Sequence, residues 1–98
     1  MHCSIATYVG DPSDLVARYE ALVAEVPAQN MRFHACARTE DGIVIFDTCP
    51  SKDVYDSFWS SPDVLALFER HGLANPVERI DFPVVRAYAG GSRVDETN

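Results

Sequence analysis

The chain has 98 residues and a mass of 10.9 kDa, which suffices for one compact domain but not for two. Its composition, 47% hydrophobic and 23% charged, is typical of a globular protein and excludes disordered and collagen-like chains. The net charge of −7 argues against a nucleic-acid partner, because nucleic-acid-binding domains usually present a basic face to the phosphates.

The sequence pattern shows no targeting segment. The longest apolar runs, residues 43–46 and 64–68, are far shorter than the about 18 residues needed to span a bilayer. The first basic residue is Arg18, so the chain does not open with the charged start of a secretory signal. We therefore expect a cytoplasmic protein that does not enter a membrane.

Neither disulfides nor a metal site are expected. Cys3, Cys36 and Cys49 are odd in number, far apart and within apparent strands, which predicts reduced thiols in the core. The histidines and acidic residues show none of the close spacings that hold a metal ion in a protein.

The start of the chain predicts a strand and a helix. Residues 2–9 are rich in β-branched and aromatic side chains and end at a Gly-Asp-Pro turn, which predicts a strand. Pro12 suits the first position of a helix, and apolar residues then recur at helical spacing until Pro27. This apolar stripe consists of Leu15, Tyr19, Leu22, Val23 and Val26.

The middle of the chain predicts a hairpin. Residues 31–39 alternate between apolar and polar side chains, and an Asp-Gly turn at 41–42 leads into a third strand at 43–48. Both parities of this third strand are apolar, so we expect a sheet that is covered on both faces. Since one layer of helices covers only one face, the simplest cover for the other is a second copy of the chain.

The last part predicts a broken helix and a strand. Residues 51–72 predict a helix that is capped by Ser51, interrupted near Pro62 and closed by Gly72. Residues 77–89 alternate again and predict one final strand, in which Pro83 indicates a sheet edge or a bulge. The single domain is therefore expected to span residues 1–89, with a flexible tail at 90–98.

The resulting order, βαββαβ, is that of the ferredoxin-like α+β class, with helices on one face of a four-stranded antiparallel sheet. An open sheet face can bind RNA, but the acidic charge and the lack of a basic aromatic motif favour sheet-to-sheet dimerisation instead.

In this setting the chain resembles the dimeric α+β barrel proteins, and among them it looks most like the antibiotic biosynthesis monooxygenase group. The resemblance rests on residues 41–48 (DGIVIFDT), 50–58 (PSKDVYDSF) and 61–62 (SP). It implies a homodimer whose two sheets pack together as a barrel, with a pocket between each sheet and its own helices. It also implies oxidation of a phenolic or polyketide-like aromatic molecule by dioxygen, without a cofactor.

The helix signature of that group differs here at two positions. Phe58 stands where the group has Trp and Val64 stands where it has His, while Trp59 lies one residue further along. A small-molecule-binding or auxiliary barrel protein without catalysis is therefore the second hypothesis.

Three residues are candidates for catalysis: His34, Trp59 and Arg86. His34 shares a strand face with two arginines, and such an imidazole can act as acid or base near neutral pH. Arg86 lies on an otherwise apolar parity of the last strand and therefore needs a partner. That partner is either a substrate carboxylate or phenolate, or an acidic residue across the dimer.

The candidates for substrate binding are Tyr8, Tyr55, Phe58, His71 and Tyr88. Aromatic side chains with polar tips suit a flat apolar ligand, although the same residues also suit an ordinary core. His71 precedes Gly72, where it can act as a base or interact with the end of the helix. We expect the pocket between the broken helix and the sheet, because the break at 61–62 prevents the helix from lying flat on the sheet.

Overall fold

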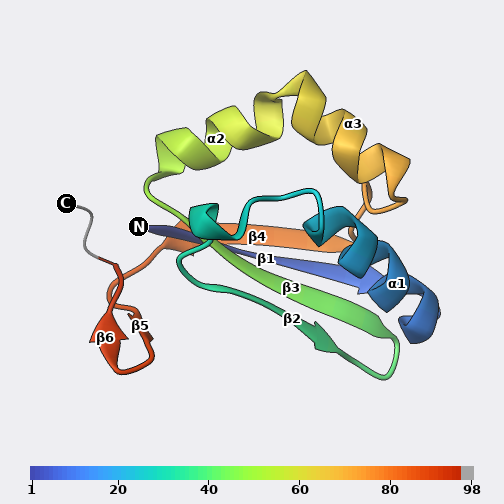
Figure 1. Cartoon of the computed structure of the whole chain (residues 1–98), viewed down its shortest axis with the longest axis horizontal. Helices are drawn as coiled ribbons and strands as arrows, with labels where there is room; N and C mark the ends of the chain where they lie inside the picture. Colours follow the sequence, from blue (N-terminus) through green and yellow to red (C-terminus); the bar gives the residue numbers. More distant parts are fainter. Residues whose placement is uncertain (96–98) are drawn as a thin grey trace.

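The structure, a computed structural model, describes residues 1–95 and shows an α+β protein with one main sheet (Figure 1). The elements follow one another as β1 (His2–Val9), α1 (Pro12–Val23), the 3-10 turn η1 (Ala28–Asn30), β2 (His34–Arg38), β3 (Gly42–Cys49), α2 (Lys52–Ser60), α3 (Pro62–Arg70), β4 (Glu78–Pro83), β5 (Tyr88–Ala89) and β6 (Ser92–Arg93). The predicted α+β class is therefore confirmed.

The four long strands form an antiparallel sheet in the order β2-β3-β1-β4, which is compatible with a ferredoxin-like fold. All three long helices lie on one face of this sheet, as Figure 1 shows. The edge position of β4 confirms the interpretation of Pro83, because a residue without an N–H group is tolerated at a sheet edge.

The core lies between the sheet and α1. Alternate residues of β1, from His2 to Tyr8, are buried beneath the helices. Ile43 of β3 and Leu73, just after α3, are fully buried at the centre, where Leu15 and Leu22 of α1 also pack. β3 runs very close to β1 where it begins, since a Cβ on Gly42 would lie only 2.0 Å from the carbonyl oxygen of Tyr8.

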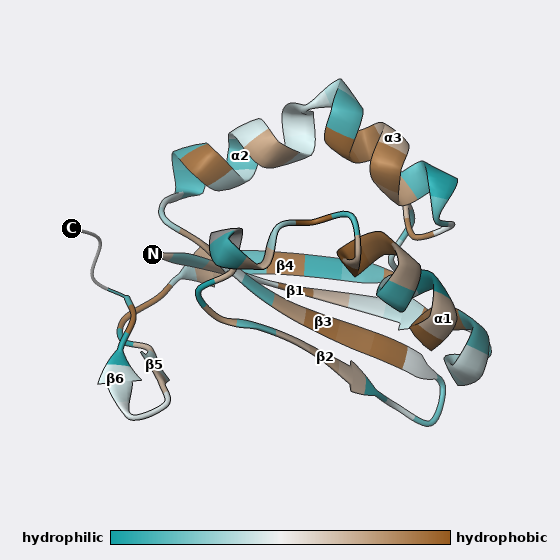
Figure 2. Ribbon diagram, in the orientation of Figure 1, coloured by the Kyte–Doolittle hydropathy of each residue, from teal (hydrophilic) through white to brown (hydrophobic). Residues whose placement is uncertain are grey.

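The opposite face of the sheet is also apolar. β3 is hydrophobic along much of its length (Figure 2), and the successive residues Ile43, Val44, Ile45 and Phe46 alternate between its two faces. On β4, Ile80 and Phe82 face away from the helices and are 43% and 41% exposed. Their cross-strand neighbours on β1 are Ile5 and Cys3. This helix-free surface is called the open face below.

The last predicted strand is shorter than expected. It ends at Pro83 rather than Ala89, and Tyr88–Ala89 pair instead with Ser92–Arg93. The turn between these two short strands is Gly90-Gly91, whose φ angles of 57° and 80° lie in the left-handed region that favours glycine. Part of the expected tail therefore forms a hairpin, and residues 96–98 of that tail lie outside the described residues.

Two further expectations concern thiols and membranes. Cys3, Cys36 and Cys49 are all free, and burial raises the pKa of each thiol. Within residues 1–95, no helix is long and apolar enough to cross a bilayer.

The start of β1 is tied to β4 and α2 by a buried imidazole. His2 Nε2 lies 2.7 Å from Asp81 Oδ1, and Lys52 Nζ lies 3.7 Å from the same oxygen. The hydrogen bond from His2 and the nearby charge of Lys52 lower the pKa of the Asp81 carboxyl. The ionised carboxylate therefore stabilises the folded chain.

We expect Asp81→Asn to destabilise the protein at pH 7 and to have a much smaller effect at pH 2.5. A lowered folded-state pKa gives stability that is present above the unfolded value of about 4 and is lost as the pH falls through the folded value. Urea unfolding midpoints of the wild type and the variant at both pH values test this. Asp53→Asn, at an exposed position of α2, is the control, and an equal difference at pH 7 and pH 2.5 would refute the assignment.

Candidate functional site

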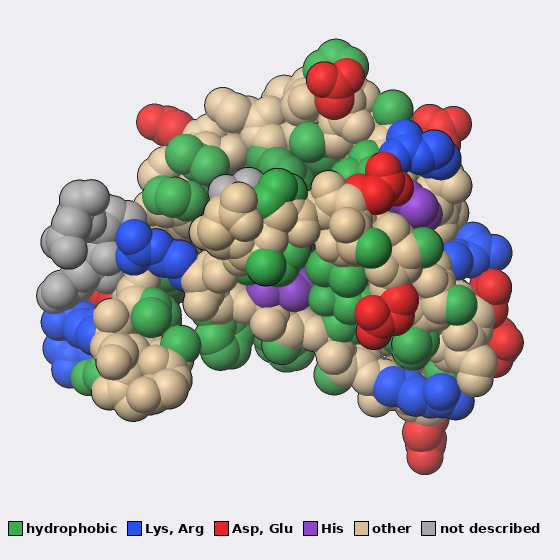
Figure 3. Space-filling model, in the orientation of Figure 1, with side chains coloured by type: hydrophobic (Ala, Val, Ile, Leu, Met, Phe, Trp, Pro, Cys, Tyr) green, Lys and Arg blue, Asp and Glu red, His purple; other side chains and the backbone are tan. Residues whose placement is uncertain are grey.

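A cavity of about 510 Å³ lies between the helices and the sheet, where the sequence predicted it. This volume is within the range of small-molecule sites. The cavity exists because α2 ends at Ser60 and α3 begins at Pro62, so that the two helices form an arch over the sheet (Figure 1). On the face drawn in Figure 3, hydrophobic side chains gather over the helices and the sheet, with histidine visible between them.

Aromatic side chains form the wall under the arch. Tyr55, Phe58 and Trp59 recur at positions i, i+3 and i+4 of α2 and so lie on one face of that helix. The Trp59 ring makes edge contacts with Phe58 and with Phe68 of α3, at centroid distances of 5.0 and 4.9 Å. The parts of these rings that are not in contact with one another form the surface that a flat apolar ligand would contact.

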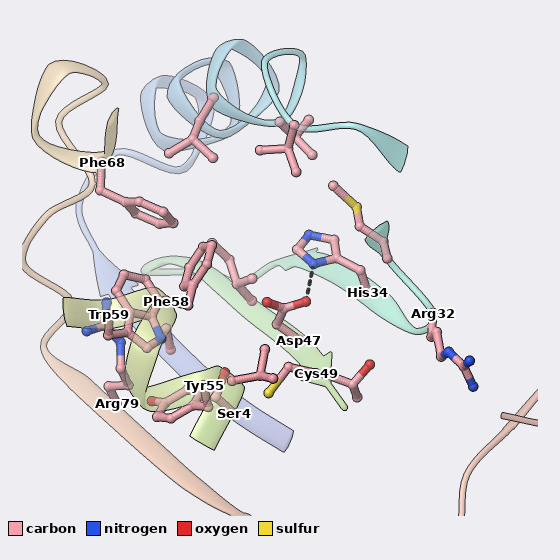
Figure 4. A pocket seen from close by; sticks show the side chains of 18 of the residues that line it. Ser4, Arg32, His34, Asp47, Cys49, Tyr55, Phe58, Trp59, Phe68 and Arg79 are labelled. Atoms are coloured by element: carbon pink, nitrogen blue, oxygen red, sulfur yellow. Dashed lines mark hydrogen bonds and ion pairs between the residues drawn. The ribbon is translucent and has the colours of Figure 1, made fainter. Parts of the chain in front are cut away.

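A hydrogen-bonded chain of three side chains, Tyr19, His34 and Asp47, lies at one end of the cavity, and Figure 4 shows its His34–Asp47 part. His34 of β2 places Nδ1 3.0 Å from Oδ1 of Asp47, its cross-strand neighbour on β3. The hydroxyl of Tyr19, on α1, lies 2.7 Å from His34 Nε2. Burial raises the pKa of Tyr19, so the phenol stays protonated and donates to Nε2, while Nδ1–H donates to Asp47.

This arrangement gives His34 the geometry of a general base. The carboxylate fixes the imidazole tautomer with its proton on Nδ1 and stabilises the cation that forms when Nε2 takes up a proton. The side chain of His34 is 16% exposed, so the ring is held within the cavity wall. Any ligand group that loses a proton to Nε2 must first displace the Tyr19 hydroxyl.

Arg79 of β4 lies at the other side of the cavity (Figure 4). Its guanidinium carbon is 3.8 Å from the centroid of the Trp59 ring, which is a close cation–π contact. Its Nε atom is buried and has no hydrogen-bond partner among the described residues. Arg79 therefore brings a positive charge next to the aromatic wall of the cavity.

The structure brings five of the predicted residues to this cavity: His34, Trp59, Tyr55, Phe58 and Tyr8. Tyr8 is buried at the cavity floor, where its hydroxyl donates to the carbonyl oxygen of Leu73 at 2.7 Å. Burial raises the pKa of this phenol and also that of Tyr55.

Three predicted residues lie elsewhere. Arg86 follows the end of β4 and is exposed, and Tyr88 belongs to the β5–β6 hairpin. Both are outside the cavity because the chain leaves the sheet after Pro83. His71 caps the end of α3 and pairs with Glu25, in a separate shallow surface hollow.

The sequence reasoning missed Tyr19, Asp47 and Arg79. Tyr19 was assigned to the apolar stripe of its helix, and the structure does place it on that face. That assignment did not reveal its hydrogen bond to His34. Asp47 carried a usable signal, because it shares the inward parity of β3 with Ile43 and Ile45. A carboxylate on an apolar strand face needs a partner.

Within residues 1–95, no group of three or more His, Cys, Asp or Glu side chains is arranged to hold a metal ion. Comparison of the chain with protein-family models, with curated proteins and with solved structures found no match.

Proposed function

We propose that the cavity binds a flat aromatic molecule and that His34 removes a proton from it. The observation that carries this proposal is the Asp47–His34 pair at one end of an aromatic-lined cavity. Tyr8, Tyr55, Phe58 and Trp59 would hold the rings, and the Asp47 carboxylate would stabilise the imidazolium.

The reaction that fits best is a cofactor-independent oxidation of the kind implied by the resemblance to antibiotic biosynthesis monooxygenases. With an anthrone, Nε2 would accept a proton from the ring methylene carbon and leave an electron-rich aromatic anion. Dioxygen would take up electrons from this anion and form a peroxide at the same carbon, which would receive the proton back from Nε2 and become a hydroperoxide. Loss of water then leaves a carbonyl, so one oxygen atom enters the quinone and the other leaves as water.

The second candidate function is binding without catalysis. It is favoured by the Tyr19 hydroxyl, which occupies Nε2 of His34 in the structure and would block proton transfer unless a ligand displaces it. In this case the cavity would still take up aromatic molecules.

Oxygen uptake with dithranol, a dihydroxyanthrone, separates the two functions. The wild type is expected to consume one dioxygen per dithranol and to yield the anthraquinone faster than buffer alone. Trp59 is the single tryptophan of the chain, so its fluorescence reports occupancy independently. Quenching without turnover would favour the binding function, and neither quenching nor turnover would reject both for this class of ligand. Trp59→Phe tests whether the indole is needed for turnover.

We also propose that two copies of the chain pack through their open faces and form the dimeric barrel. The open face carries Ile5, Val44, Phe46, Ile80 and Phe82. Exposing this apolar face to water would lower the stability of the chain, because a chain of this size has only a small core. The three free thiols support a cytoplasmic location, where thiols stay reduced.

Phe46→Glu is expected to convert the dimer into a monomer, because it would place a charge at the centre of the proposed interface on β3. Light scattering should give about 22 kDa for the wild type, twice 10.9 kDa, and about 11 kDa for the variant. Val85→Glu is the control, since Val85 is 93% exposed and lies beyond the end of β4. A wild-type mass near 11 kDa at micromolar concentration would contradict the dimer.

A further inference from the structure

Arg79 has no ion-pair partner among the described residues that line the cavity. Three other arginines among residues 1–95 form ion pairs with carboxylates, namely Arg18, Arg70 and Arg93. Among residues 1–95 no carboxylate lies within ion-pair distance of Arg79. Asp81, the nearest acidic residue on the same side of β4, is bonded to His2 and Lys52 instead.

The surroundings of Arg79 make this charge costly without a ligand. The guanidinium stacks on the Trp59 ring and hydrogen-bonds the phenol of Tyr8, and its charge also acts on the phenol of Tyr55. Its Nε–H group alone is left without a partner among the described residues. These aromatic groups contact a cation favourably but do not neutralise it. A partly buried cation with a buried, unbonded N–H group is stabilised most by an anion that also accepts hydrogen bonds.

The strand register separates Arg79 from the His34–Asp47 pair. Arg79 lies in the same cross-strand row as Ala6, Ile45 and Cys36, with His34 two residues from Cys36 along β2. Three strand spacings and two residues along the strand give about 16 Å between the Cα atoms of Arg79 and His34. In Figure 4 the Phe58 ring lies between these two groups. A ligand that contacts both groups therefore spans the cavity from β4 to β2.

We infer that the ligand of this cavity is a fused-ring aromatic carboxylate, bound as its anion with the carboxylate on Arg79. The planar guanidinium offers two parallel N–H groups, which match the two oxygens of a carboxylate. The rings then lie along Trp59 and Phe58, with their far end toward His34. This inference rests on the proposed function only in that both require an aromatic ligand in the cavity.

Two probes of the same shape, one charged and one uncharged, test the inference. Anthracene-2-carboxylate and anthracene-2-carboxamide are titrated into the wild-type protein at pH 7.5, with Trp59 fluorescence as the readout. We expect the carboxylate to bind at least about tenfold more tightly than the amide. Arg79→Met should abolish this preference, and Arg79→Lys should restore part of it.

Arg86→Met is the matched control, because Arg86 is exposed and outside the cavity, so its loss should leave the preference unchanged. Thermal unfolding of Arg79→Met establishes that the variant is folded. Equal affinities of the two probes for the wild type, no binding of either probe, or a preference that persists in Arg79→Met would each overturn the inference.

The result of this binding experiment can be distinguished from the result of the test of the proposed reaction. A lost carboxylate preference with intact dithranol oxidation would reject the role of Arg79 alone. An intact preference without oxidation would reject the oxygenase reaction and leave the carboxylate site standing.

Discussion

Replacing His34 by glutamine is expected to lower the rate of dithranol oxidation by about 10²- to 10⁴-fold, the usual contribution of a general base. Glutamine preserves much of the side-chain volume but has no basic nitrogen. Asp47→Asn should also lower the rate strongly, because an amide in place of the carboxylate neither fixes the tautomer nor stabilises the imidazolium.

Stopped-flow or oxygen-electrode measurement of kcat tests this expectation. His71→Gln is the matched control, since His71 lies at the end of α3 outside the cavity. The general-base role is rejected if His34→Gln turns over within about threefold of the wild type. Trp59 fluorescence should still report binding of anthracene-2-carboxylate to both variants, His34→Gln and Asp47→Asn, which separates lost chemistry from lost binding.

Ile43→Ala is expected to reduce the free energy of unfolding by about 2–5 kcal/mol. Ile43 is 0% exposed and lies in the core cluster with Leu15 and Leu22, so truncation leaves a cavity that the sheet cannot readily close. This loss is a large share of the about 5–15 kcal/mol that stabilises a typical domain.

Urea unfolding followed by circular dichroism measures this loss. Val85→Ala, at a position that is 93% exposed, should change the stability by less than about 0.5 kcal/mol. A loss below about 1 kcal/mol for Ile43→Ala would show that the centre of the core lies elsewhere.

Local signals in the sequence were sufficient to predict most of the elements. The Gly-Asp-Pro turn, the apolar stripe of α1 and the Ser51 cap each act over a few residues, and the Ser51 hydroxyl does accept from the N–H of Val54. The break at Pro62 is confirmed for the same reason, because proline cannot continue the backbone hydrogen bonds of α2. The Gly90-Gly91 turn carried an equally local signal that was overlooked.

The partner of His34 depended on the register of the hairpin, which local signals left open. A two-residue loop at Asp41–Gly42 would place Cys49 opposite His34. The observed loop is one residue earlier, with the N–H of Thr39 donating to the carbonyl oxygen of Gly42, and it places Asp47 opposite His34. Both registers put the imidazole on the same face, so strand alternation could not distinguish them.

The choice between Arg79 and Arg86 depended on which face of the last strand turns inward. Alternation gave two parities but did not tell which of them faces the helices. In the structure the parity with Ile80 and Phe82 faces the open side, while Arg79 and Asp81 face the helices. In a sheet that is apolar on both faces, the more apolar parity of a strand does not have to be the one that faces the helices.

The crystal structure of the protein with anthracene-2-carboxylate tests the central claim most directly. We expect the rings to lie between α2 and the sheet along Phe58 and Trp59, with the carboxylate on Arg79 and the far ring toward His34. A filled core around Trp59, with the ligand held instead between the open faces of two chains, would contradict the account.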